Sequence, residues 1–253
     1  MTMSETKERY SFTKLSTFLT CPYGFYLKYV LNQKGVGNAF SSYGSFIHEL
    51  LEQNAKGEVE VWDLPEMYEW GFDTAVPEKF PRNKYVSLRD SYYERGLDFL
   101  KSFQGYSGFK ILGVEQAFEY EVDDFIFNGV IDIILKDESG KLIIRDYKSK
   151  SSFKSKQEKT EYARQLYLYS MYVKNRFGRF PDELQFLMFK KKKPETIVFD
   201  EKTYNETIQW MKDTVKTIRE AFAFPPKCSW FYANNLCDHR EYCDMKGGFY
   251  EEK

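Results

Sequence analysis

The chain has 253 residues and a formal net charge of -1, and 42% of its residues are hydrophobic. This length and composition allow one large core or two modest ones, and the lack of a low-complexity tract excludes extended disorder. Neither a signal peptide nor an apolar run long enough to cross a bilayer is visible, so we expect a soluble, cytoplasmic protein with no membrane partner.

The first third of the chain is predicted to be mainly helical. Residues 1–9 are polar and are expected to be frayed. Residues 11–30 are predicted to form two short helices that meet near Cys21-Pro22, because proline can begin a helix. Residues 41–53 have the spacing of an amphipathic helix, with His48 at the border of its apolar side. A lone histidine in such a place is more often structural than a metal ligand.

The segment that follows is expected to lead into a sheet. A less regular stretch at residues 58–82 precedes a further helix, predicted at residues 84–103. The sheet is predicted to begin within residues 110–122, where Glu115 and Glu119 lie among apolar residues. The helices before it are expected to cover that sheet.

A β-hairpin is predicted within residues 129–150. Two apolar runs rich in β-branched residues, at 130–135 and 142–144, flank the polar turn 137–140. Short apolar runs on either side of a polar, glycine-containing turn are typical of a hairpin.

Asp132 and Asp146 are predicted to be neighbours across this hairpin. Ser139 in the turn is midway between them, and residues equidistant from the turn centre lie opposite each other, with Cβ atoms roughly 5 Å apart. Strand alternation places Lys148 on the face of Asp146 and Tyr147 on the other face. Such carboxylates require either protonation of one or a cation between them, and oxygen ligands suit Mg²⁺. The simpler alternative is a buried Asp–Lys ion pair.

The elements after the hairpin indicate a mixed α/β domain around a central sheet. A helix is predicted at residues 160–177, where Gln165 and Tyr169 share one face at i,i+4 spacing, as an ordinary half-buried aromatic face also would. Two strands at residues 184–189 and 195–199 and a long helix at residues 201–221 complete the series. This order favours a mixed sheet over a regular doubly wound one.

Lysines gather at the hairpin and after it, although the net charge is close to zero. They are Lys148, Lys150, Lys154, Lys156, Lys159 and the run at residues 190–193. A local basic face of this kind can contact nucleic acid, but it is more often solvated surface.

The cysteines all lie outside the predicted strands. They are Cys21 near the N-terminus and Cys228, Cys237 and Cys243 in the C-terminal tail. In a reducing cytoplasm, soft thiolates favour an iron–sulfur cluster or zinc over disulfides, and either would tie the two ends of the chain together. Because no C-x-x-C pair is present, unrelated free thiols are the alternative.

Several motifs follow one another in a specific order. They are Leu15-Ser16-x-Phe18-x-x-Cys21-Pro22, Gly44-x-x-x-His48, Gly129-x-x-Asp132, Asp146-x-Lys148, Gln165-x-x-x-Tyr169 and the cysteine-bearing tail. This order resembles the RecB-type exonucleases of the PD-(D/E)XK superfamily, and most closely the iron–sulfur branch that includes the CRISPR adaptation exonuclease and the AddB nuclease domain. The likeness covers nearly the whole chain.

The resemblance implies a restriction-endonuclease-like fold, with a mixed central sheet flanked by helices, in a single nuclease domain over residues 1–253. That domain would comprise a helical N-terminal part at residues 10–105 and a catalytic core at residues 110–221. A cysteine-bearing tail at residues 222–247 would pack on the N-terminal helices.

The resemblance also assigns roles to individual residues. The ligands of a Mg²⁺ or Mn²⁺ ion would be His48, Asp132, Asp146 and the backbone carbonyl of Tyr147. Lys148 would orient or help deprotonate the attacking water and offset charge on the phosphate. Gln165 and Tyr169 would position Lys148 and the DNA backbone.

The cysteines depart from the family pattern. The usual set is one N-terminal cysteine and a C-terminal trio whose first two members are separated by two residues. Three of these positions are filled, by Cys21, Cys237 and Cys243, but Asn234 stands at the fourth. Cys228 would then serve as a displaced ligand of a [4Fe-4S] cluster. Zinc, with His239 in the ligand set, or no cluster at all are the alternatives.

By this resemblance the protein would be a metal-dependent exonuclease acting on DNA with a free end. It would work in recombination, repair or CRISPR adaptation, alongside partner proteins of such a pathway. One alternative is a non-cutting DNA-end binding or adaptor subunit of a larger recombination complex, although the intact carboxylate set argues against it. A nuclease directed at RNA is a third possibility that metal chemistry does not distinguish.

Overall fold

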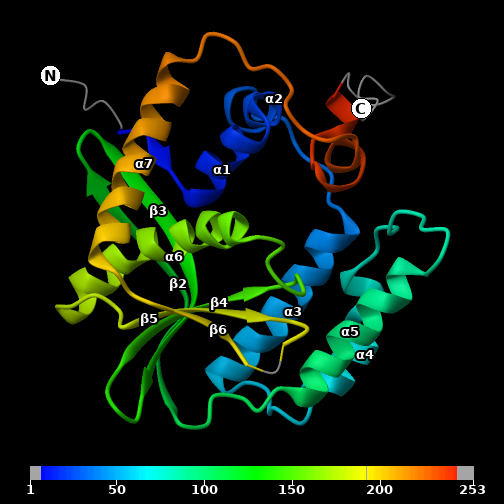
Figure 1. Ribbon diagram of the computed structural model, residues 1–253. Coiled ribbons are helices and arrows are strands. Elements are labelled where there is room, and N and C mark those ends of the chain that lie inside the picture. Colours follow the sequence, from blue (N-terminus) through cyan, green and yellow to red (C-terminus); the bar gives the residue numbers. More distant parts are fainter. Residues whose placement is uncertain (1–6, 192, 244–253) are drawn as a thin grey trace, which may run out of the picture.

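In the computed structural model, which describes residues 7–191 and 193–243, a six-stranded mixed sheet lies between two groups of helices (Figure 1). The strands follow the order β1 (Arg9–Tyr10), β3 (Phe125–Asp137), β4 (Leu142–Lys148), β5 (Glu183–Met188) and β6 (Glu195–Val198), and β2 (Phe109–Val122) pairs with β3. The β1–β3 and β4–β5 pairs are parallel, whereas the other pairs are antiparallel. The predicted fold class, a mixed sheet flanked by helices, is confirmed.

The predicted hairpin is formed by β3 and β4. Ile133 pairs with Arg145 and Lys136 with Leu142, which is the predicted register, and one further step puts Asp132 opposite Asp146. In the turn, the Asp137 carboxylate accepts hydrogen bonds from the Lys141 amide (2.8 Å) and the Ser139 hydroxyl (2.8 Å). Gly140 has φ 88°, a left-handed conformation that glycine adopts without a Cβ penalty.

The N-terminal helices begin where the sequence predicts them. Helix α1 (Phe12–Thr20) starts after Ser11, whose hydroxyl accepts a hydrogen bond from the Lys14 amide (3.2 Å). Helix α2 (Pro22–Phe25) follows directly and continues into a π-helical turn at Tyr26–Val30. Helix α1 ends just before Cys21 and a new helix begins with Pro22, because proline is favoured at the first position of a helix.

The N-terminal residues that the structure describes are not frayed, so the prediction for residues 7–9 is wrong. Arg9–Tyr10 forms β1, and the Ile126 amide donates a hydrogen bond to the Glu8 carbonyl (2.9 Å). Tyr10 is buried against the sheet. Backbone pairing with a long neighbouring strand outweighs the polar character of this segment. Residues 1–6 lie outside the described part.

Three helices cover one face of the sheet: α3 (Ala39–Lys56), α4 (Leu64–Ala75) and α5 (Leu88–Ser102). Helix α4 lies within the stretch predicted to be irregular, so that prediction is wrong. Its apolar residues Leu64, Tyr68 and Phe72 recur at i,i+4 spacing and are buried, and Pro65 occupies the first turn. The short, charged segments around it hide this period in the sequence.

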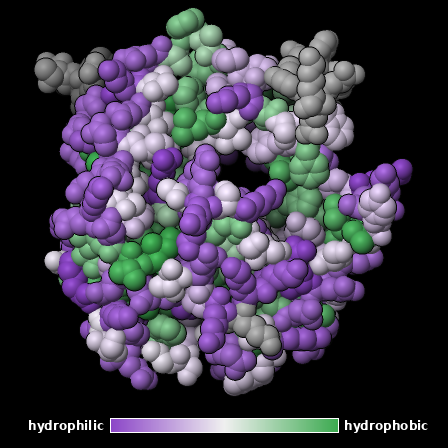
Figure 2. Space-filling model, viewed as in Figure 1, coloured by the Kyte–Doolittle hydropathy of each residue, from purple (hydrophilic) through white to green (hydrophobic). Residues whose placement is uncertain are grey.

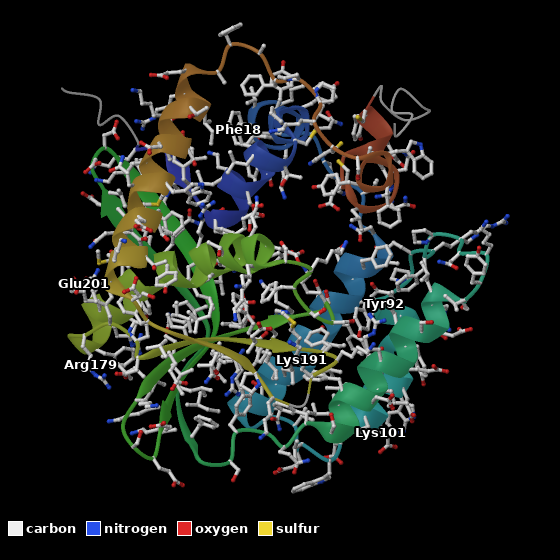
Figure 3. All side chains as sticks on the ribbon, in the orientation of Figure 1. Phe18, Tyr92, Lys101, Arg179, Lys191 and Glu201 are labelled. Carbon is white, nitrogen blue, oxygen red and sulfur yellow. The ribbon has the colours of Figure 1, made fainter. Side chains whose placement is uncertain are left out.

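Helices α6 (Lys156–Phe177) and α7 (Glu201–Glu220) cover the opposite face together with α1 (Figure 1). Strand β3 supplies both cores, because Ile134 packs on the α6 side and Ile133 on the α3 side. Charged side chains such as Lys101, Arg179 and Glu201 lie at the periphery (Figure 3). None of the described helices combines the length and the apolar character that a membrane span needs.

The surface is hollowed near its centre. Figure 2 shows an opening between the N-terminal helices above and helices α3 and α6 below. The C-terminal tail lies beside α2 at the upper edge of this opening (Figure 1). The C-terminal tail and helix α2, which are far apart in the sequence, therefore lie side by side.

Replacement of Ile133 tests the account of the core. Ile133 is fully buried between the sheet and α3, so Ile133→Ala should lower the free energy of unfolding by about 2–5 kcal/mol through lost burial and a residual cavity. Val198→Ala on the edge strand, where the side chain is 74% exposed, should change it by less than about 0.5 kcal/mol. Urea unfolding measures both, and equal effects would contradict this packing.

Candidate active site

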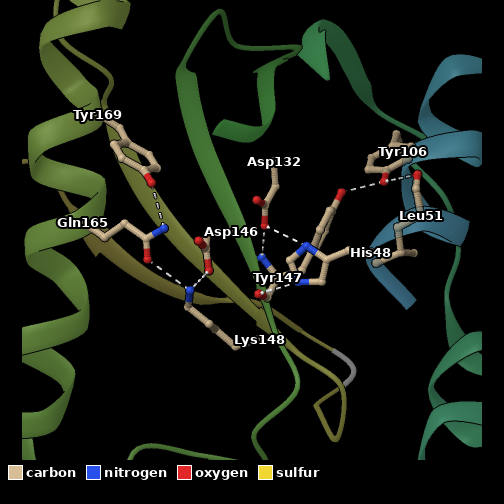
Figure 4. A network of polar contacts seen from close by, with 9 residues as sticks. All are labelled: His48, Leu51, Tyr106, Asp132, Asp146, Tyr147, Lys148, Gln165 and Tyr169. Atoms are coloured by element: carbon tan, nitrogen blue, oxygen red, sulfur yellow. Dashed lines mark hydrogen bonds and ion pairs between the residues drawn. The ribbon is translucent and has the colours of Figure 1, made fainter. Parts of the chain in front are cut away.

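Four elements converge on one cavity of about 480 Å³. Helix α3 contributes His48, β2 contributes Glu115 and β3 contributes Asp132, while β4 contributes Lys148 and Tyr147. Figure 4 shows the polar side chains between α6 and α3, with β3 and β4 passing behind them. The sheet therefore carries the carboxylates and Lys148, and the flanking helices bring His48, Gln165 and Tyr169.

Three side chains offer ligand atoms at one point. One atom each of His48, Glu115 and Asp132 lies within 4.8 Å of the others, and His48 Nδ1 is 3.6 Å from Asp132 Oδ2. Carboxylate oxygens with one imidazole nitrogen are a donor set that divalent cations such as Mn²⁺ or Mg²⁺ accept. The residues present therefore fit a divalent ion.

The main chain of Tyr147 orients two of these ligands. Its amide donates a hydrogen bond to Asp132 Oδ2 (2.7 Å), and its carbonyl oxygen lies 3.0 Å from His48 Nε2. A carbonyl can only accept, so Nε2 carries the proton and the lone pair of Nδ1 is left for a metal. The Tyr147 side chain is fixed in turn, because its hydroxyl is 2.6 Å from that of Tyr106, which donates to the Leu51 carbonyl (Figure 4).

Burial governs the protonation of the ligands. It raises the pKa of the Asp132 carboxyl well above its usual range, and the neighbouring charge of Asp146 raises it further. Burial also lowers the pKa of the His48 imidazole, although the charge of Asp146 acts in the other direction. A neutral imidazole is the form that binds metal. A cation at this point would offset the repulsion between the carboxylates.

Lys148 is held by two partners. Its ammonium lies 2.7 Å from Asp146 Oδ2 and donates a hydrogen bond to Gln165 Oε1 (3.1 Å). Gln165 Nε2 then donates to the Tyr169 hydroxyl (3.0 Å), as Figure 4 shows. Burial acts to lower the pKa of Lys148, but the charges of Asp146 and Asp132 and the hydrogen bond to Asp146 outweigh it, so its pKa is raised. Lys148 is therefore a cation here.

The structure thus groups the predicted residues in two sets. His48 and Asp132 meet around the candidate metal position with the Tyr147 carbonyl next to them. Asp146 is paired with Lys148 instead of lying in the group of three, although its charge acts on Asp132. The ion pair that the sequence offered as a simpler alternative is present, and it lies beside the ligand group.

Glu115 also belongs to the ligand group, a place that its sequence context did not predict. Val114 pairs with Ile133 and Gln116 with Ile131, which leaves Glu115 facing Asp132 between these pairs. Its backbone has φ 42°, a left-handed conformation that costs a non-glycine residue on the order of 1–3 kcal/mol. The one available signal was a carboxylate among apolar strand residues. The register shift between Ile111 and Gly113 hides its alignment with Asp132.

The thiols also gather, although the tail has no predicted strand or long helix. Burial raises the pKa of Cys228 to about 12, and a hydrogen bond and charge from Cys21 and the charges of Cys237 and Cys243 add to this. None of the four is in a disulfide, and Cys21, Cys237 and Cys243 are buried. Cys21 at the start of α2 is therefore brought next to the C-terminal three. Residues 244–247 of the expected tail lie outside the described part.

Hydrogen bonds join the tail to the start of α3. The Val36 amide donates to the Asp238 carbonyl (2.7 Å), and the Asn38 side chain donates to the Leu236 carbonyl (3.2 Å). His239 is buried, and neither ring nitrogen has a hydrogen-bond partner among the described residues. Asn234, at the usual cysteine position, donates its side-chain amide to the Trp230 carbonyl (2.9 Å).

Part of the predicted basic face is neutralised. Lys150 pairs with Glu158, and both Lys159 and Lys191 pair with Glu195. For these three lysines, the structure agrees with the solvated-surface alternative. Lys192 lies outside the described residues.

Comparison with known proteins gives a family and one similar fold. The model of the PD-(D/E)XK nuclease superfamily matches residues 9–246. A crystal structure of a "putative exonuclease" from Eubacterium rectale superposes with a TM-score of 0.53 at 12% identity, covering 100% of this chain and 96% of that one. The crystal structure of SSO0001 gives a TM-score of 0.41 at 15% identity, covering 96% and 89%. No curated protein matches the chain.

Two motif glycines should respond differently to alanine. A Cβ at Gly129 would lie 2.8 Å from the Tyr169 ring and 2.9 Å from the Phe118 ring, so Gly129→Ala should cost about 1–3 kcal/mol of stability. Gly44 lies inside α3, and a Cβ there would be 3.6 Å from Ser149, which is an ordinary van der Waals distance. Gly44→Ala should therefore stabilise the helix by about 0.5–1 kcal/mol. Thermal unfolding of both variants measures the contrast, and a loss at Gly44 equal to that at Gly129 would contradict it.

Proposed function

Because the chain belongs to the PD-(D/E)XK nuclease superfamily, we propose that it is a metal-dependent exonuclease that hydrolyses phosphodiester bonds in DNA. The observation that carries this proposal is the meeting of His48, Glu115 and Asp132 beside the Asp146–Lys148 pair. The order of motifs supports the narrower assignment to the RecB-type iron–sulfur branch, with a role in recombination, repair or CRISPR adaptation.

The site residues would divide the chemistry between them. His48, Glu115, Asp132 and Asp146 would hold Mg²⁺ or Mn²⁺, and the Tyr147 carbonyl would orient the His48 ring by accepting a hydrogen bond from Nε2. A bound ion of this kind lowers the pKa of water and neutralises charge on phosphoryl oxygens. The protein's own residues supply orientation and a fixed positive charge.

Lys148 would act as the fixed cation of the reaction. Its raised pKa keeps it protonated, so it would stabilise charge on the phosphate and orient the attacking water. Gln165 holds the ammonium through Oε1, and Tyr169 fixes the amide of Gln165 through its hydroxyl. Gly129 leaves room for the Tyr169 ring, which explains why a glycine stands three residues before Asp132.

A [4Fe-4S] cluster bound by the four cysteines would fasten the tail to the N-terminal helices. The proximity of Cys228 to Cys21, Cys237 and Cys243 supports this assignment, with Cys228 as the displaced ligand. Its role would be structural, because the tail bonds to residues 36–38 at the start of α3, the helix that carries His48. The hollow of Figure 2 borders this region and would admit a single DNA strand.

Cleavage assays test the proposed activity. With Mg²⁺ or Mn²⁺, the protein should degrade end-labelled linear DNA and spare closed circles. Asp146→Ala should lower the rate by at least about a hundredfold with little loss of DNA binding, because it removes the partner of Lys148.

The matched control is Asp213→Ala, since this carboxylate lies on α7 with an exposed side chain. It should leave the rate unchanged. Cutting of circles would make the protein an endonuclease. Undiminished cleavage by Asp146→Ala would contradict the proposed site, and binding without cleavage by a folded, metal-loaded protein would favour the adaptor function.

A spectroscopic experiment tests the cluster and its displaced ligand. Protein purified without oxygen should contain iron and show the broad visible absorbance of an iron–sulfur cluster. Cys228→Ser should lose both, and the double variant Cys228→Ser/Asn234→Cys should regain them, because it restores the usual spacing before Cys237. A colourless wild-type protein with bound zinc would refute iron.

A further inference from the structure

The segment between α4 and α5, residues 76–87, projects from the molecule as an arm (Figure 1). Its base is anchored by aromatic rings. The Phe80 ring lies 5.3 Å from that of Phe40 and 5.2 Å from that of Tyr92, measured between centroids. Phe40 also lines the cavity that contains His48 and Lys148. The arm therefore begins at the wall of the active site.

The tip of the arm presents an aromatic side chain on a defined turn. The side-chain oxygen of Asn83 accepts hydrogen bonds from the amides of Tyr85 (2.9 Å) and Val86 (3.3 Å), an arrangement that fixes the backbone. Tyr85 is nevertheless 82% exposed. The turn therefore exposes the ring of Tyr85 to solvent, where the ring makes no contribution to a hydrophobic core.

The cations of the arm are not neutralised. Within residues 7–191 and 193–243, no carboxylate lies within 4.0 Å of the charged nitrogens of Lys79, Arg82 or Lys84, in contrast to the paired lysines near the hairpin. Arg89 at the start of α5 does pair with Asp73. Lys79, Arg82 and Lys84 also line a cavity of about 900 Å³ beneath the arm. Positive charge is therefore concentrated beside the exposed ring.

We propose that the arm binds a single strand of DNA at the entrance to the active site, with Tyr85 stacked on a base and Arg82 and Lys84 on phosphates. The proposal rests on the function proposed above. Alternating aromatic and basic side chains are what single strands require, since every base offers a stacking face and every nucleotide a charge. An acidic protein segment would use the cations but would not need the ring.

Binding of a fluorescent single-stranded oligonucleotide in EDTA tests the arm without cleavage. Tyr85→Ala should weaken binding at least about fivefold, the lower end of the loss of one stacked base, whereas Tyr85→Phe should bind as the wild type does. Arg82→Ala/Lys84→Ala should flatten the dependence of log K on log salt by about 1.4, since each phosphate contact to a single strand contributes about 0.7.

Controls separate the arm from general charge and from folding. Lys202 and Lys216 on α7 are exposed and distant from the arm in Figure 1, so Lys202→Ala/Lys216→Ala should leave the salt dependence unchanged. Thermal unfolding of each variant checks its fold. Wild-type affinity in Tyr85→Ala, or a wild-type salt slope in Arg82→Ala/Lys84→Ala, would overturn the proposal.

A small phosphodiester distinguishes this proposal from the function on which it rests. Thymidine 5′-(4-nitrophenyl) phosphate is too short to reach the arm, so the arm variants should hydrolyse it at the wild-type rate. If the wild type cleaves neither this ester nor DNA but binds the strand through Tyr85, the nuclease function fails while the arm stands. If the wild type cleaves the ester and the arm variants bind DNA normally, the arm fails while the nuclease stands.

Discussion

The pairing of β3 with β4 fixes two carboxylates, Asp132 and Asp146, next to each other in a largely buried position. Like charges removed from water repel strongly, and turning away would cost Asp132 its hydrogen bond from the Tyr147 amide and Asp146 its pairing with Lys148. The surrounding groups offset this repulsion with one fixed cation, Lys148, and they offer ligand atoms that could hold a second cation, a metal ion. A divalent ion is the natural occupant, because one ammonium cannot balance the added charge of Glu115.

The helices serve this arrangement from opposite sides. From α6, Gln165 and Tyr169 hold the ammonium of Lys148, and Gly129 gives the Tyr169 ring its place. On α3, His48 directs its unprotonated Nδ1 towards Asp132, because its Nε2–H donates a hydrogen bond to the Tyr147 carbonyl. The residues at the start of α3 are hydrogen-bonded to the tail. The position of the cysteine-bearing tail is therefore coupled, through this one helix, to the position of the candidate ligand His48.

The sequence allowed prediction of features that depend on local patterns. The β3–β4 hairpin and its register follow from two apolar runs around one turn, and α6 and α7 follow from long periodic segments. Features that depend on distant pairing were missed. β1 exists because β3 offers it a backbone partner, and Glu115 joins the site because a shifted register brings it opposite Asp132. The residue spacing within β1 or β2 alone does not predict either contact with β3.

The most direct test of the central claim is the position of Mn²⁺ in crystals of the protein, located by its anomalous scattering. We predict a peak bounded by His48 Nδ1 and by carboxylate oxygens of Glu115 and Asp132, at metal–ligand distances of roughly 2.0–2.3 Å. A Mn²⁺-soaked crystal with no peak there, and with Asp132 and Asp146 unchanged, would contradict it.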